Sequence, residues 1–118
     1  MNRLTKRLID LKKQNKKALV AYLVAGDPDI ETTLQLMQLF IESGVDVIEI
    51  GVPFTDPIAE GPIIQKAHDR ALAKDISLTS IFEMVQKFRE IDNNTPIVLM
   101  GYLNTFLSHK NLIEENKK

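Results

Sequence analysis

The sequence predicts an α/β fold built on a parallel β-sheet. Three short apolar runs, at residues 18–26, 45–51 and 96–102, alternate with longer segments whose apolar residues recur at helical spacing. Runs of this kind, without polar alternation, are typical of strands that are buried on both faces of a parallel sheet. Parallel strands also require long crossover connections, which the helical segments provide. We therefore expect a series of β/α units.

An amphipathic helix is expected first, over residues 3–14, where leucines recur at helical spacing among Lys and Arg. The Lys-rich stretch 12–17 fits a solvated helix end, where cations interact favourably with the helix dipole, better than a phosphate or membrane patch. This N-terminal region also lacks the continuous apolar core of a signal peptide. The run "ALVAYLVAG" at 18–26 is then expected to form the first buried strand.

The second helix is expected to begin at the motif "DPD". Asp27 or Asp29 can cap this helix, and Pro28 suits its first turn. Helical spacing continues as far as Gly44, which is expected to end the helix. The next run, "VDVIEIG" at 45–51, is the second expected strand.

A loop rich in Gly and Pro follows at 52–61, and Pro62 is expected to begin a third helix. A fourth helix, with its own apolar stripe, is expected from about Ser77 until the motif "NNTP" breaks it. The run "PIVLMGY" at 96–102 is the third expected buried strand.

We expect a single domain over residues 1–118, and three strands leave that domain incomplete. A three-stranded parallel sheet with helices on one side has two unpaired edges and one uncovered apolar face. Further helices, a partner or the remaining strands of a closed barrel are the alternatives for covering that face. An eight-stranded barrel needs about 250 residues, and this chain has 118.

Composition excludes several classes of function. The net charge of −1 argues against a nucleic-acid-binding protein. The absence of cysteine excludes disulfides, thiolate metal sites and cysteine nucleophiles. The longest apolar runs are far shorter than the roughly 18 residues that a membrane span needs. We therefore expect a cytoplasmic protein without a nucleic-acid or membrane partner.

Glu49 is the first candidate for chemistry, because it lies at the end of an apolar strand. Alternation places it on the same face as Val45 and Val47. In barrels and open α/β sheets, ligands bind at the C-terminal ends of the strands. Burial favours the protonated form of a carboxyl group, so a buried Glu can give and take a proton near neutral pH. The alternative is a structural carboxylate paired with a Lys or with backbone N–H groups.

The loop after this strand, "VPFTDPIAEGP", carries a second acidic candidate, Glu60. Glu60 either faces water or turns back over the strand end, where it could accept a hydrogen bond from a substrate N–H. Carboxylates suit Mg²⁺ or Ca²⁺, but the usual spacing of metal ligands is absent. His68 and His109 fit surface positions on a helix or loop. We therefore expect no metal site.

Three segments, "AGDPD", "GVDVIEIGVPFTDPIAEGPIIQKAHDRAL" and "TPIVLMGYLN", follow one another in order. Together, over about residues 18–104, they resemble the tryptophan synthase alpha chain family. The resemblance implies a TIM (β/α)8 barrel, of which this chain would be the N-terminal portion with about three β/α units. It also implies retro-aldol cleavage of indole-3-glycerol phosphate to indole and glyceraldehyde 3-phosphate, in tryptophan biosynthesis.

The resemblance implies roles for individual residues. Glu49 takes the position of the general acid/base. Glu60 takes the position of the partner of the indole nitrogen, which is typically Asp in the family, so the charge is kept on a longer side chain. Tyr22, where the family often has Phe, and Met100 match positions in the indole pocket, and Tyr102 is assigned with them to substrate binding.

The resemblance also implies a partner. Pro53, Thr55, Asp56 and Asn104 match the surface that meets a beta chain in an alpha2-beta2 type complex. The beta chain is expected to bind pyridoxal phosphate, and this chain is expected to need no cofactor. The family often continues after Asn104 with Pro, whereas this chain has Thr105 and the likeness then fades.

In the family, the substrate phosphate is held late in the barrel, after strands seven and eight, at a helix N-terminus. No such segment occurs in the 118 residues, so we expect them to have little or no activity alone. The alternative is a non-catalytic interaction module that binds a tryptophan synthase beta chain. A third hypothesis, another phosphate-binding barrel enzyme such as a phosphosugar isomerase, does not account for the loop after Glu49.

Overall fold

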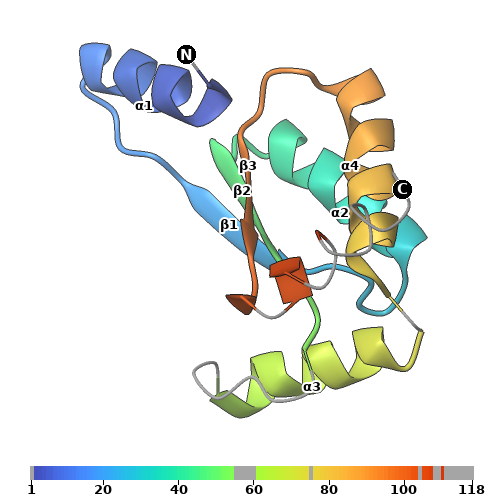
Figure 1. Cartoon of the computed structure of the whole chain (residues 1–118). Coiled ribbons are helices and arrows are strands. Elements are labelled where there is room, and N and C mark those ends of the chain that lie inside the picture. The colour runs from blue at the N-terminus through green and yellow to red at the C-terminus, as the bar shows by residue number, and fades with distance from the viewer. Residues whose placement is uncertain (1, 55–60, 75, 104, 108–109, 111–118) are drawn as a thin grey trace.

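The structure, a computed structural model, describes residues 2–54, 61–74, 76–103, 105–107 and 110 (Figure 1). Helices and strands follow one another along the chain in the predicted order. Their bounds are α1 Arg3–Lys13, β1 Val20–Val24, α2 Ile30–Glu42, β2 Val47–Gly51, α3 Gly61–Leu72, α4 Leu78–Ile91 and β3 Ile97–Met100.

The three strands form a parallel sheet in the order β1-β2-β3, as predicted. Glu49 in β2 is the register partner of Tyr22 in β1 and of Val98 in β3. Gly51 is likewise paired with Val24 and Met100. Partners in a parallel ladder point to the same side, and side chains alternate along each strand. The candidate residues Tyr22, Glu49 and Met100 therefore lie on one face of the sheet.

Helices α2 and α4 lie side by side and cover the opposite face (Figure 1). Ile48 and Ile50 of β2 point into this layer and are fully buried against Met37 of α2 and Ile81 and Phe88 of α4. Burying a side chain of this size stabilises a fold by about 1.5–3 kcal/mol. The main hydrophobic core thus lies between the sheet and these two helices.

The other two helices lie at the ends of the strands. Figure 1 shows α1 beyond the N-terminal ends and α3 across the C-terminal ends. Ala67 and Ala71 of α3 pack on Val24 at the end of β1. No helix among the described residues is long and apolar enough to cross a membrane.

Short polar side chains cap the N-termini of α1, α2 and α4. Asp29 caps α2 by accepting the N–H of Thr32 at 2.7 Å, and Ser77 caps α4 by accepting the N–H of Ser80 at 3.1 Å. Pro28 therefore precedes the cap and does not lie in the first turn of α2, where we expected it. Gly44 follows the C-cap of α2 with φ +90°, a conformation that favours glycine, and ends the helix as predicted.

Two of the strands are less buried than predicted. The central strand β2 is buried apart from Glu49, but Val20 in β1 is 52% exposed and Met100 in β3 is 37% exposed. Each of these strands lies at an edge of the described sheet, and α2 and α4 cover only one of its faces. Among the described residues, the uncovered face that we expected for a three-stranded sheet is therefore present on the side of Glu49.

Candidate active site

Glu49 lies on the uncovered face, in the central strand, close to the C-terminal end. It is partly buried, whereas we expected full burial. The difference follows from the open face, which gives solvent access to the side chain. Within the part of the chain that the structure describes, no side chain pairs with the Glu49 carboxylate and no N–H donates to it. The alternative of a structurally paired carboxylate therefore has no support from these residues.

Tyr22 lies directly across the ladder from Glu49. Its ring extends over β2 beyond Glu49, because a Cβ built on Gly51 would lie 2.1 Å from the Tyr22 hydroxyl oxygen. Tyr22 also packs against Val24 in the small cluster that α3 forms on the end of β1. The structure thus brings together two residues that the sequence assigned to the same site. The glycine at position 51 makes room for the ring.

The other two substrate-binding candidates follow on β3. Met100 is the register partner of Gly51, and its carbonyl accepts the N–H of Val52 at 2.7 Å, which extends the ladder past β2. Tyr102 lies just beyond β3 and stacks on Phe54, with ring centroids 4.3 Å apart and planes 27° apart. Pro53, assigned from the sequence to the partner interface, is buried directly before Phe54. Among the described residues, an expected interface residue, Pro53, therefore lies next to the aromatic pair that contains the substrate-binding candidate Tyr102.

His68 was wrongly expected on the surface. It is 1% exposed, and its Nδ1 accepts the backbone N–H of Phe54 at 3.1 Å. The sequence contained a signal for this burial, because His68 lies four residues after Ile64 and three before Ala71, on the apolar stripe of the helix.

Arg70, also in α3, makes a second polar contact that the sequence did not indicate. Its Nε and Nη2 donate to the two carboxylate oxygens of Asp27, at 2.6 and 3.0 Å. This pairing raises the pKa of Arg70, chiefly through the side-chain hydrogen bond. We expected Asp27 as a possible helix cap, but it joins the β1–α2 connection to α3.

Five residues singled out in the sequence lie outside the described residues, so their roles remain predictions. They are Thr55, Asp56, Glu60, Asn104 and His109. Among the residues that are described, no group of three or more His, Asp or Glu side chains could hold a metal ion. The described site is thus one carboxylate on an apolar, partly aromatic face. Such a group can exchange protons with a flat apolar ligand placed against Tyr22.

The sequence matches the family model of the tryptophan synthase alpha chain over residues 8–118. It is 54% identical over 104 residues to the tryptophan synthase alpha chain of Alkalilimnicola ehrlichii. The matched segment covers 88% of this chain and 38% of that protein. It is 59% identical over 88 residues to that of Neisseria meningitidis serogroup B, covering 75% of this chain and 34% of that protein. The chain thus spans well under half the length of these relatives.

Solved structures give the same result. Tryptophan synthase subunit alpha from Legionella pneumophila superposes with a TM-score of 0.90 at 50% identity, over 92% of this chain and 42% of that one. A chain of the tryptophan synthase a2b2 complex from Pyrococcus furiosus superposes with a TM-score of 0.71 at 43% identity, over 78% of this chain and 36% of that one. The predicted fold, the N-terminal β/α units of a (β/α)8 barrel, is therefore confirmed.

Proposed function

The chain belongs to the tryptophan synthase alpha chain family, and we propose that it supplies the acid/base part of a site that cleaves indole-3-glycerol phosphate in tryptophan biosynthesis. One observation carries the proposal. Glu49 lies at the C-terminal end of the central strand, on an otherwise apolar face, without a charged partner among the described residues. The C-terminal ends of the strands are where (β/α)8 barrels bind and convert ligands.

A single carboxyl group suits this reaction. Cleavage requires a proton to be added to the ring carbon that carries the side chain, and a proton to be removed from the neighbouring hydroxyl group. The carbon–carbon bond then breaks, its electron pair returns to the ring, and indole and glyceraldehyde 3-phosphate separate. Glu49 would donate the first proton and accept the second. Neither step requires a cofactor from this chain.

Glu60 is proposed as the acceptor of the ring N–H. Protonation of the ring carbon makes the indole cationic, and a nearby carboxylate stabilises that charge as it develops. Tyr22, Met100 and Tyr102 are proposed to line the indole pocket. The common face of Tyr22, Glu49 and Met100 in the sheet supports this assignment.

The substrate phosphate needs strands beyond β3. The matched part of the chain covers 38% of the Alkalilimnicola ehrlichii relative, and the described sheet contains β1, β2 and β3. We propose that the 118 residues alone have little lyase activity and that the reaction needs the rest of the barrel. The proposed partner is a beta chain that carries pyridoxal phosphate, met by Pro53, Thr55, Asp56 and Asn104, and the proposed location is the cytoplasm.

The test is a chimera in which residues 1–104 replace the matching segment of the Legionella pneumophila alpha subunit, assayed for release of indole from indole-3-glycerol phosphate. The chimera should be active, and Glu49→Gln should lower its kcat by about 10²–10⁴-fold, the range of general acid–base catalysis. An inactive but folded chimera, or an active Glu49→Gln variant, would refute the proposed role. Near-normal turnover by the 118-residue chain alone would refute the proposed need for the remaining strands.

A second candidate function is a non-catalytic module that binds a beta chain. The observation in its favour is at the start of the expected interface, where Pro53 is buried and the next residue, the partly buried Phe54, is held by His68 and Tyr102. Mixing the purified chain with a beta chain should then give a complex by light scattering. The absence of a complex would exclude this candidate and leave the catalytic proposal in place.

A further inference from the structure

The first residues after β2 are held from two sides. On one side, Phe54 donates its backbone N–H to His68 in α3; on the other, its ring stacks on Tyr102 after β3. Two residues earlier, Val52 donates its backbone N–H to the carbonyl oxygen of Met100 in β3. The segment that follows the strand of Glu49 is thus tied both to a helix and to the neighbouring strand.

His68 is well suited to hold a backbone N–H. Its Nδ1 presents a lone pair to the Phe54 N–H and accepts this hydrogen bond. The side chain is 1% exposed, so water does not compete for Nδ1. The helix that carries the ring is itself packed on the sheet, since Ala67 and Ala71 lie against Val24 of β1. Phe54 is therefore fixed relative to β1 as well as to β2.

We propose that His68 is a positioning residue, which sets the place of the Phe54–Tyr102 pair at the ends of β2 and β3. This inference rests on the proposed function for its biological meaning, because the pair lies at the end of the strand that carries Glu49. The contact itself is independent of catalysis. His68 thereby couples α3 to Phe54, which precedes the second acidic candidate, Glu60, by six residues in the sequence.

The contact can be measured in the full 118-residue chain labelled with ¹⁵N-phenylalanine, which gives amide signals from five residues. The Phe54 amide should exchange slowly with deuterium. His68→Leu removes the acceptor at similar volume and should speed that exchange about tenfold or more. His68→Asn places an amide oxygen close to the position of Nδ1 and should keep most of the protection. Asp69→Asn, an exposed neighbour on the same helix, is the matched control and should change nothing.

Two further signals separate positioning from general stability. The amide of Phe88, in the core helix α4, reports global unfolding. The ring protons of Tyr102 should be shifted upfield by the stacked Phe54 ring, and His68→Leu should reduce this shift while His68→Asn retains it. A Phe54 amide that is unprotected in the unsubstituted chain, or equally protected in His68→Leu, would overturn the proposal. The proposal would also be overturned if His68→Leu raised the exchange rate of the Phe88 amide as much as that of the Phe54 amide. None of these signals depends on lyase activity.

Discussion

At the scale of single residues, Gly51 is the position where added volume has the most direct consequence. A methyl group there would meet the Tyr22 hydroxyl at 2.1 Å and the ring carbon Cζ at 2.8 Å. The ring would have to leave its place beside Glu49, because Gly51 lies in the backbone of the central strand. The site and the stability of the fold are therefore linked at this residue.

We expect Gly51→Ala to lower the free energy of unfolding by about 1–3 kcal/mol, the usual cost of overpacking. Urea denaturation followed by circular dichroism measures this change. The matched background is Tyr22→Val, which removes the ring, and in this background the same substitution should cost less than about 0.5 kcal/mol. An equal cost in both backgrounds would show that the ring does not cause it.

The site could be predicted from the sequence only in part. Alternation along one strand placed Glu49 on a ligand-facing side, and the resemblance assigned Tyr22 and Met100 to the same site. The sequence could not show that Tyr22 lies opposite Glu49, because pairing depends on the register between separate strands. The stacking of Phe54 on Tyr102 could not be predicted either, because it also depends on how separate strands are placed relative to each other. His68 was misplaced because a polar residue on an apolar stripe was read as solvent-facing.

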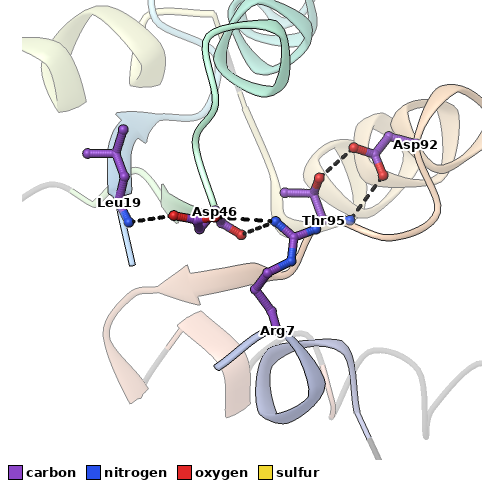
Figure 2. Close-up of polar contacts among 5 residues, drawn as sticks. All are labelled: Arg7, Leu19, Asp46, Asp92 and Thr95. Atoms are coloured by element: carbon purple, nitrogen blue, oxygen red, sulfur yellow. Dashed lines mark hydrogen bonds and ion pairs between the residues drawn. The ribbon is translucent and has the colours of Figure 1, made fainter. Parts of the chain in front are cut away.

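At the scale of elements, α1 is held to the N-terminal ends of the strands by a polar network around Asp46 (Figure 2). The Asp46 carboxylate accepts the backbone N–H of Leu19 at 2.8 Å and lies 3.7 Å from the guanidinium of Arg7. Arg7 also donates to the Asp46 carbonyl at 3.3 Å. A second contact joins Arg3 to Asn93, through bonds of 2.7 and 2.8 Å. No residue of α1 is fully buried, so polar contacts contribute much of its attachment.

Asp46→Ala should therefore destabilise the chain by about 1 kcal/mol, because it removes an acceptor and leaves the Leu19 N–H without its side-chain partner. Asp46→Asn keeps an acceptor for Leu19 and loses only a partly exposed ion pair, so its cost should stay below about 0.5 kcal/mol. Urea denaturation compares the two variants. If the two variants lost equal free energy of unfolding, the effect would come from the lost charge, and the proposed role of the Leu19–Asp46 hydrogen bond would be contradicted.

The cap of α2 predicts a dependence on acid. Hydrogen bonds from Thr32 lower the pKa of Asp29 from its ordinary value of 3.8. A carboxyl whose pKa is lower in the folded chain stabilises the fold fully above the ordinary value, and this contribution disappears as the pH falls through the folded-state pKa. The contribution should therefore be constant at neutral pH and decline only below about pH 5.

Asp29→Asn is expected to leave stability at pH 7 nearly unchanged, because Asn is an equally good helix cap. The variant should lose less stability than the unsubstituted chain as the pH falls from about 5 to 2, since it has no carboxylate to protonate. Thermal unfolding across this range measures the difference. Parallel pH profiles for the two proteins would contradict the assignment of the acid dependence to Asp29.

Most elements could be predicted because their signals are local. Helical spacing, the caps at Asp29 and Ser77, and the stop at Gly44 each depend on neighbouring residues. The burial of the strands was harder to predict, because it depends on what covers the sheet. Val20 and Met100 belong to apolar runs like those of a doubly covered sheet, yet they are partly exposed at its edges. These runs fit a complete barrel better than the three-stranded sheet.

At the scale of the whole molecule, α2 and α4 cover one face of the sheet, and the described helices leave much of the other face uncovered (Figure 1). The open face carries Val20, Met100 and the partly exposed Glu49, and it is bordered by the edges of β1 and β3. In the related barrels, the matched segment makes up about two fifths of the chain. The other strands of such a barrel would pair with both edges and enclose this face.

The 118-residue chain is therefore expected to self-associate, because open strand edges beside an apolar face favour pairing between molecules. Static light scattering should show an average mass that rises with concentration. Val20→Lys places a charge on the edge strand, at a residue that is 52% exposed, and should reduce this association. Leu39→Lys is the matched control, because Leu39 is 53% exposed but lies on α2, and it should have little effect. A monomer at all concentrations, or equal effects of the two substitutions, would contradict association through the sheet edge.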